Sequence, residues 1–91
     1  MGKEIKLFKS EERKNRSEVS AFLHEIADKI EEGRVILRQA GEEITLEMPH
    51  HLILEIQVED EDKKNKGIQH SLEIEIKWFD DDMSSGPFKL A

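Results

Sequence analysis

The feature that most constrains the fold of this chain is a run near its C-terminus, residues 71–78, in which apolar and charged residues alternate. Side chains on a β-strand point alternately to its two faces. The apolar members of the run therefore share one face: Leu72, Ile74, Ile76 and Trp78. The charged members share the other face: Glu73, Glu75 and Lys77. The run predicts a strand with one dry face and one solvated face.

A second pattern, with the period of an α-helix, occupies residues 17–32. Its apolar residues recur at intervals of three and four, which places them along one stripe: Val19, Phe22, Leu23, Ile26, Ala27 and Ile30. Ser17 is a suitable N-cap, and Gly33 stands where a residue in the left-handed conformation would end the helix. We therefore predict one amphipathic helix over 17–32.

The remaining patterned segments have a period of two, and turn residues or a charged loop separate them. They predict four strands, at residues 34–39, 43–48, 52–59 and 71–78. The loop between the last two strands, residues 60–67, is all charge, Asn and Gly. Consecutive strands with short connections pair antiparallel most easily. The sequence therefore predicts an α+β fold, in which the helix packs on a mainly antiparallel four-stranded sheet.

The two ends of the chain lack these patterns. Residues 4–15 are either an additional N-terminal edge strand or a loose arm, and the sequence leaves both open. A chain of 91 residues is large enough for one small core and too short for two. We expect an N-terminal arm or edge strand over 1–16, the α+β domain over 17–79, and a flexible tail over 80–91.

Composition limits the classes of function. A net charge of −7 opposes binding to nucleic-acid phosphates or anionic membranes and favours basic partners. The chain has no cysteine, which excludes a disulfide framework, a thiolate zinc site and a thiol nucleophile. No segment approaches the roughly 20 apolar residues that span a bilayer, and the N-terminus lacks a signal-peptide pattern. We expect a cytoplasmic protein.

No motif indicates catalysis, a cofactor or a metal. His50 and His51 would point in opposite directions on an extended chain, and neither His24 nor His70 has a partner at ligand spacing. The acidic run at residues 80–82 lacks the spacing of a calcium loop. The sequence contains no nucleophile–base pair and no phosphate-binding pattern. We therefore expect no enzymatic activity, no cofactor and no metal site.

The outer sheet face is the candidate interaction surface, because it combines carboxylates with two isoleucines. Its candidate residues are Ile36, Ile53, Glu55, Glu73 and Glu75. If Ile56 opposes Ile74 across the last two strands, their neighbours are opposed as well. Glu55 then faces Glu75, a destabilising like-charge pair that a basic partner would relieve. The alternative is a merely solvated face that keeps the protein soluble and blocks edge-to-edge aggregation.

The only tryptophan, Trp78, has two interpretations. It either anchors a ligand or partner, as large aromatic side chains often do, or closes one end of the sheet by packing. Its shared parity with Ile74 and Ile76 favours packing.

The helix followed by Gly33, the two hairpins and the run from Leu72 to Trp78 together resemble the amphi-Trp domain. This small prokaryotic family is named for an amphipathic strand that ends in tryptophan. The resemblance covers roughly residues 17–78, and Trp78 alone corresponds to a hallmark residue. The family has no assigned biochemical activity, so the resemblance implies little about function.

These features favour a non-enzymatic protein-interaction module, which binds a partner or itself through the acidic outer face or an open edge strand. Ile36 and Ile53 would be its apolar anchors. The alternative is a nucleic-acid-associated protein that uses basic residues near the helix ends: Arg13, Lys14, Arg16, Arg34 and Arg38. The predicted outer face has no aromatic residues on which bases could stack, so we rank this alternative second.

Overall fold

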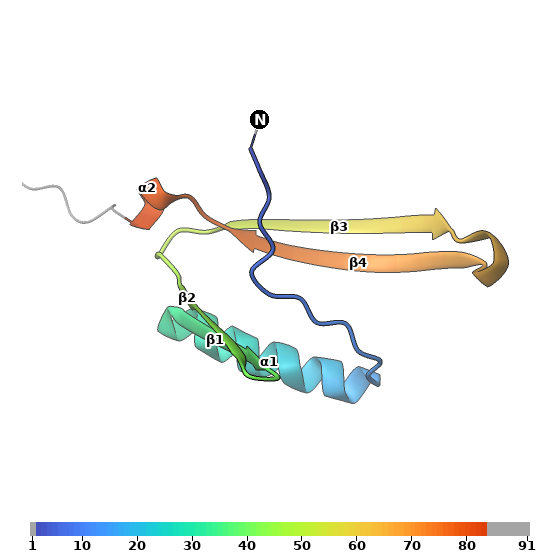
Figure 1. The fold of residues 1–91 in the computed structure, drawn as a ribbon, viewed down its shortest axis with the longest axis horizontal. Coiled ribbons are helices and arrows are strands. Elements are labelled where there is room, and N and C mark those ends of the chain that lie inside the picture. Colours follow the sequence, from blue (N-terminus) through green and yellow to red (C-terminus); the bar gives the residue numbers. More distant parts are fainter. Residues whose placement is uncertain (1, 84–91) are drawn as a thin grey trace, which may run out of the picture. The chain divides into compact units, whose positions relative to one another are not determined.

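The computed structural model describes residues 2–83 and has an α+β arrangement of helix and antiparallel strands, as predicted (Figure 1). The elements follow in the order α1 (Arg16–Glu32), β1 (Arg34–Gln39), β2 (Glu42–Glu47), β3 (Ile53–Asp62), the 3-10 helix η1 (Lys64–Lys66), β4 (Ile68–Lys77) and α2 (Asp80–Met83). The chain divides into two compact units, residues 1–48 and 49–91.

The four strands form two separate two-stranded sheets, β1–β2 and β3–β4, and this corrects the prediction of a single four-stranded sheet. Two features of the chain account for the separation. Pro49, two residues after the end of β2, has no N–H to donate and cannot continue the ladder. β3 and β4 have ten residues each and match one another in length, whereas β2 has only six.

Helix α1 begins one residue before the predicted start, and its N-cap is Asn15 rather than Ser17. The Asn15 side-chain oxygen accepts a hydrogen bond from the Glu18 backbone N–H at 2.8 Å, and Glu18 Oε1 accepts one from the Asn15 N–H at 3.0 Å. This reciprocal pair needs a Glu or Gln three residues after the cap, and the residue three after Ser17 is a serine. The helix ends as predicted at Gly33, which has φ of 89°.

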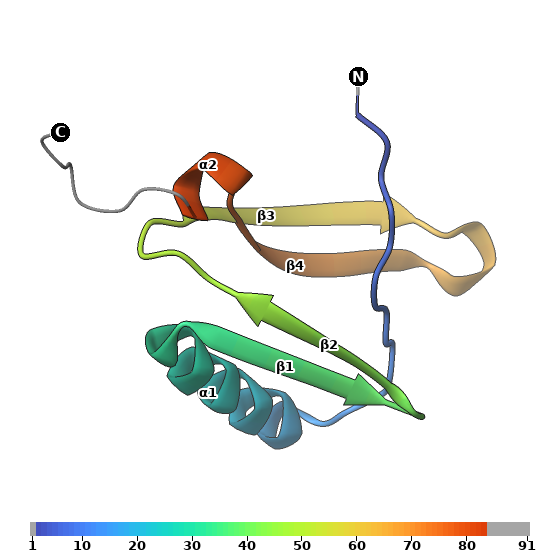
Figure 2. The ribbon, with the colours of Figure 1, turned by 60° about the vertical axis from the view of Figure 1, so that its left-hand side comes forward.

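The first unit is a helix packed on a hairpin, and Figure 2 shows α1 lying along β1. Val35 on β1 has only 5% of its surface exposed and is the one buried apolar residue among residues 2–83. Half-buried apolar residues of the helix and both strands complete this small core: Ile26, Ile30, Leu37, Ile44 and Leu46. The core therefore consists of Ile26 and Ile30 of the helix stripe and the inward face of β1–β2.

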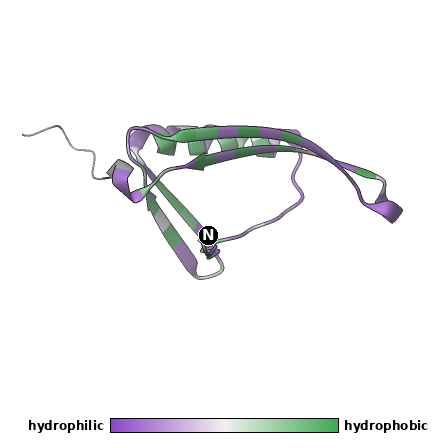
Figure 3. Cartoon of the chain, turned by 90° about the horizontal axis from the view of Figure 1, so that it is seen from above, coloured by the Kyte–Doolittle hydropathy of each residue, from purple (hydrophilic) through white to green (hydrophobic). Residues whose placement is uncertain are grey.

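The second unit is a long antiparallel hairpin, the β3–β4 ribbon, whose register runs from Ile53 opposite Lys77 to Asp62 opposite Ile68. Ile56 opposes Ile74, which is the register assumed in the sequence analysis for the like-charge pair. β3 continues to Asp62, within the predicted loop, and β4 begins at Ile68, before the predicted start at residue 71. Asp60 and His70 face each other in this added part of the ladder. Figure 3 shows the alternation of apolar and polar residues along the ribbon.

The structure decides between the two alternatives for the N-terminal segment and adds a short helix near the C-terminus. Described residues 2–15 form no strand, so the structure has no N-terminal edge strand; Ser10 Oγ accepts a hydrogen bond from Gln39 Nε2 at 3.5 Å. Asp80–Met83 forms the short helix α2 where the sequence predicted a flexible tail. The rest of the predicted tail, 84–91, lies outside the described residues.

Candidate interaction site on the β3–β4 ribbon

The ribbon brings four of the five predicted interaction residues to one face. We call this the acidic face, and it carries Ile53, Glu55, Gln57 and Glu59 of β3 with Ser71, Glu73, Glu75 and Lys77 of β4. The fifth predicted residue, Ile36, lies on β1 in the first unit, where it opposes Thr45. Ile36 and Ile53 therefore belong to different sheets, although both are exposed.

The like-charge pair predicted from the register is present on the acidic face, since Glu55 opposes Glu75. Lys77 approaches both: its Nζ lies 2.8 Å from Glu55 Oε1 and 3.4 Å from Glu75 Oε1. The hydrogen bond from Lys77 and the charge of its ammonium lower the pKa of Glu55. The hydrogen bonds to Glu55 and Glu75, followed by the Glu55 charge, raise the pKa of Lys77. Lys77 therefore relieves part of the like-charge repulsion between Glu55 and Glu75, which the sequence analysis assigned to a basic partner.

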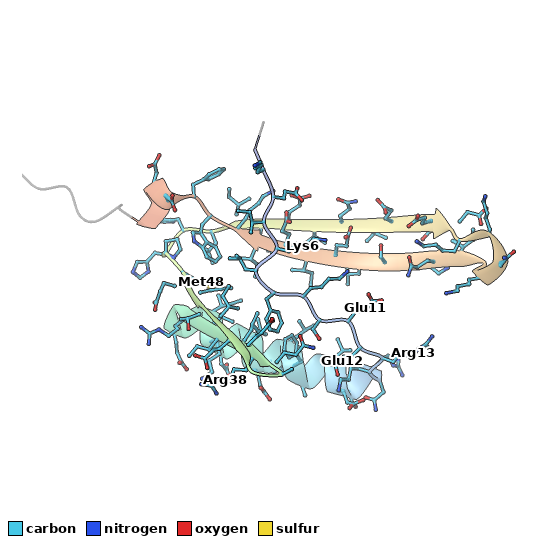
Figure 4. The ribbon with its side chains drawn as sticks, viewed as in Figure 1. Lys6, Glu11, Glu12, Arg13, Arg38 and Met48 are labelled. Atoms are coloured by element: carbon cyan, nitrogen blue, oxygen red, sulfur yellow. The ribbon has the colours of Figure 1, made fainter. Side chains whose placement is uncertain are left out.

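A shallow hollow of about 80 Å³ lies at the centre of the acidic face and is lined by Glu55, Gln57, Glu73 and Glu75. Gln57 opposes Glu73, and its Nε2 donates a hydrogen bond to Glu59 Oε2 at 3.1 Å. The carboxylates are exposed, and side chains stand along both strands (Figure 4). An exposed, anionic surface of this kind attracts cationic side chains by long-range electrostatics more than by tight contact.

The opposite side of the ribbon, which we call the apolar face, carries three cross-strand pairs of aliphatic residues: Leu54 with Ile76, Ile56 with Ile74, and Val58 with Leu72. The alternation of residues predicts a dry face for this side of β4, yet Leu72 and Ile74 are exposed, as are the apolar residues of β3. The exposed fractions run from 52% for Ile74 to 74% for Val58, and only Ile76 is half-buried. The reason is that a two-stranded hairpin has no layer of its own to cover either face. Sequence periodicity could not have revealed this exposure.

Trp78 stands directly after the last residue of β4, and Leu52 directly before the first residue of β3. Both side chains are half-buried at this end of the ribbon. The half-burial does not discriminate between the two interpretations of Trp78, packing and anchoring.

Both strands of the ribbon have an open edge. Within residues 2–83, β3 and β4 pair only with each other. A strand with one neighbour keeps a row of backbone N–H and C=O groups on its outer edge, which can pair with another extended chain. An open edge strand was one of the interaction surfaces expected from the sequence, and the ribbon provides two within the described residues.

The first unit has a groove that the sequence analysis did not find, between the N-terminal segment, α1 and the end of β1. Its volume is about 620 Å³. Apolar side chains line much of it: Phe8, Val19, Ala21, Phe22 and Leu37. Part of the apolar stripe of α1 is thus exposed, with Phe22 at 53%.

The basic residues considered for nucleic-acid binding are largely matched with carboxylates. Arg34 Nε lies 2.8 Å from Glu47 Oε1, and Arg38 pairs with Glu43. Lys14 Nζ lies 3.9 Å from Glu12 Oε1. Arg38 and Arg13 are marked in Figure 4. Neutralisation within the chain reduces the attraction that these cations can exert on phosphates.

Residues 2–83 contain no group of three or more His, Cys, Asp or Glu side chains placed to hold a metal ion. His50 and His51 are exposed in the connection between β2 and β3, and His70 Nδ1 lies 2.7 Å from Asp60 Oδ1 across the ribbon. None of the helices in this described part is both long enough and apolar enough to cross a bilayer.

The fold and the ribbon together define a small α+β protein built from two antiparallel hairpins, one of which carries a helix. The family model of the Amphi-Trp domain matches residues 1–91, and the chain belongs to this family. The match includes the N-terminal and C-terminal segments, which lie outside the range 17–78 expected from the resemblance. No curated protein and no solved structure has significant similarity to the chain.

Proposed function

We propose that this chain is a non-enzymatic protein-interaction module, which binds an extended basic segment of a partner protein along the open edge of β3. The observation that carries the proposal is the ten-residue ribbon whose strands pair only with each other within the described residues. A bound segment would add a third strand to the ribbon, which is a recurring mode of peptide recognition. A cytoplasmic location stays a prediction.

The acidic face supports the choice of a basic segment. An added strand would place alternate side chains on the same side as Glu55 and Glu59, within reach of lysine or arginine. Ile53, 43% exposed on the same face, would supply an apolar contact at one end. β3 is the better edge, because the acidic-face cation Lys77 lies on β4.

The test is an NMR titration of the isotopically labelled full chain with a synthetic peptide of alternating lysine and valine, about as long as β3. We expect shifts of β3 amides and an affinity that falls as salt is added. A matched peptide with glutamate in place of lysine should not bind. The E55Q/E59Q variant should bind about two- to thirtyfold more weakly, because two exposed charge pairs contribute about 0.2–1 kcal/mol each. The E25Q/E31Q variant of α1 is the control.

Two further peptides test strand addition directly. Each carries backbone N-methyl groups at every second residue, in one register or the other, so that one of the two cannot donate its hydrogen bonds to β3. Strand addition predicts that one methylated peptide loses binding. Equal binding of both peptides would contradict the edge mechanism, and binding of the glutamate peptide would contradict the role of charge.

We rank nucleic-acid association second, because Lys14, Arg34 and Arg38 already contact carboxylates. Fluorescence anisotropy with labelled single-stranded RNA and duplex DNA should show no binding at moderate salt. Binding with a steep salt dependence would favour this alternative over the peptide mechanism.

A further inference from the structure

We propose that the partner segment at the β3 edge runs antiparallel to β3 and has the side-chain pattern basic–basic–apolar–polar–apolar–basic–apolar. The segment is the one in the proposed function, on which this proposal rests; its direction and its pattern are what is added. Two properties of β3 carry the proposal. One is the set of backbone groups that point to its outer edge, and the other is the order of the side chains beside them.

The backbone groups that point outward from β3 follow from two hydrogen bonds across the ribbon. The Lys63 N–H donates to the Gly67 carbonyl at 2.8 Å, and these two residues continue the register of the ribbon. Ser71 Oγ donates to the Glu59 carbonyl at 3.3 Å, so this carbonyl also points toward β4. Hydrogen-bonded and non-hydrogen-bonded pairs alternate along an antiparallel ladder. The N–H and C=O groups on the outer edge therefore belong to the alternate residues of β3: Leu54, Ile56, Val58, Asp60 and Asp62.

This alternation decides how an added strand meets the acidic face. In an antiparallel segment, the residues opposite Ile56 and Val58 would exchange hydrogen bonds with them and share the apolar face. The residues opposite Glu55 and Glu59 would stand in non-hydrogen-bonded pairs, in which the side chains approach each other more closely. A parallel segment lacks such close pairs, and its pairing is slightly less stable per residue. Contact between lysine and the two carboxylates therefore favours the antiparallel direction.

The order of carboxylates along β3 places the cations of the segment. Glu55 is the one carboxylate in the first half of β3 and already lies 2.8 Å from the Lys77 ammonium. Glu59 and Asp60 are neighbours in the second half, on opposite faces. Glu59 has no ion pair among residues 2–83, and Asp60 has one partner, His70 at 2.7 Å. Two adjacent cations should therefore stand beside Glu59 and Asp60, which is the N-terminal end of an antiparallel segment.

The remaining positions of the segment follow from parity. The residues opposite Val58 and Ile56 should be apolar, because these side chains are 74% and 63% exposed and aliphatic cross-strand pairs stabilise a sheet. The residue between them opposes Gln57 and should be polar. The peptide Lys-Lys-Val-Ser-Val-Lys-Val meets all of these conditions when its first residue lies opposite Asp60 and its last opposite Leu54.

Charge exchange between the full chain and this peptide tests the direction by NMR titration. The E59K variant should bind the peptide about two- to tenfold more weakly, and glutamate at the second peptide position should restore the affinity. The matched E55K variant should instead be restored by glutamate at the sixth position. Restoration of E59K by the sixth position would indicate a parallel segment and overturn the proposal. Equal restoration by both positions, or by neither, would also overturn it.

Backbone N-methylation of the same peptide separates a failure of this proposal from a failure of the proposed function. Methyl groups on the three valines remove N–H groups that point toward β3 in the antiparallel arrangement, and should weaken binding at least about tenfold. Methyl groups on the second, fourth and sixth residues should be tolerated. The reverse result would overturn the proposed direction and pattern but leave binding at the β3 edge intact. Equal binding of the two methylated peptides, or no binding of the unmethylated peptide, would overturn both proposals.

Discussion

Lys77 and Glu55 form a diagonal ion pair across the β3–β4 ribbon, with 2.8 Å between Nζ and Oε1. The register opposes Glu55 to Glu75, and the same ammonium lies 3.4 Å from Glu75. One cation thus compensates two carboxylates that the alternating sequence forces onto one face. This compensation lets the ribbon keep an acidic surface without an unrelieved like-charge pair at that point.

Replacement of Lys77 by Met should raise the pKa of Glu55 toward its ordinary value. The hydrogen bond and the positive charge that lower this pKa both come from Lys77. The measurement is a carbon-detected NMR titration of the Glu55 side-chain carboxyl group in both proteins. Lys29→Met on α1 is the control. An unchanged Glu55 pKa in the Lys77 variant would show that the ion pair does not form in solution.

The contribution of this pair to stability should depend on pH in a defined way. The pKa of Glu55 is lowered in the folded chain, so its contribution is present above the unfolded pKa and is lost as pH falls through the folded pKa. The pKa of Lys77 is raised, so its contribution is present below the unfolded pKa and is lost as pH rises through the folded pKa. The difference in urea midpoint between wild type and K77M should therefore be largest near neutral pH and shrink well below about pH 4. A difference that grows on acidification would contradict this assignment.

Replacement of Ala40 by Asn should stabilise the β1–β2 hairpin. Gln39 pairs with Glu42, which leaves Ala40 and Gly41 as a two-residue loop, and both have positive φ, 45° and 84°. Turns with positive φ at both positions favour Asn-Gly, because alanine in the left-handed region carries a steric cost of about 1–2 kcal/mol. We expect A40N to raise the free energy of unfolding by about 0.5–1 kcal/mol. The control, Ala27→Asn within α1, should lower it.

Replacement of Asn15 by Ala should destabilise α1 by about 1 kcal/mol, since it removes the side-chain acceptor of the capping box. Replacement of Ser17, the N-cap expected from the sequence, should have almost no effect, because Ser17 lies within the helix. Urea unfolding followed by circular dichroism compares the two variants. A larger loss for S17A than for N15A would place the helix start at the position expected from the sequence.

Replacement of Val35 by Ala should destabilise the first unit by about 2 kcal/mol. Val35 is the one buried apolar residue among residues 2–83, and the change leaves a cavity between β1 and the residues around it. Val19→Ala on α1 is the matched control. Val19 is 45% exposed, so this substitution should lower the free energy of unfolding by less than half as much as Val35→Ala. Equal losses in thermal or urea unfolding would show that the core of this unit is not centred on Val35.

Much of the local structure followed from the sequence because it depends on periodicity and on single residues with specific backbone preferences. The helix stripe, the stop at Gly33 and the antiparallel pairing of the last two strands are confirmed. The pairing of Ile56 with Ile74 could only be assumed, because a slip of one residue would put the glutamates on the apolar face but a slip of two residues would keep both faces. The exact cap was missed, although Asn15 and Glu18 stand at the spacing of a capping box.

The candidate site was predictable only in part. Ile53, Glu55, Glu73 and Glu75 share a face because they lie on two neighbouring strands with the same parity. Ile36 has suitable parity as well, but it lies on a different sheet. Parity assigns a residue to one face of its own strand and carries no information on which strands belong to one sheet.

The sequence by itself therefore determined the helix, the strands and their faces, because all of these follow from local side-chain geometry, whereas the register of the ribbon had to be assumed. Only the tertiary structure decided that the strands form two sheets and that Val35 alone is buried among the described residues. It also decided that the apolar residues of the ribbon are exposed. These outcomes depend on which surfaces cover one another, and the alternation of residues along a strand is the same whether its apolar face is covered or open.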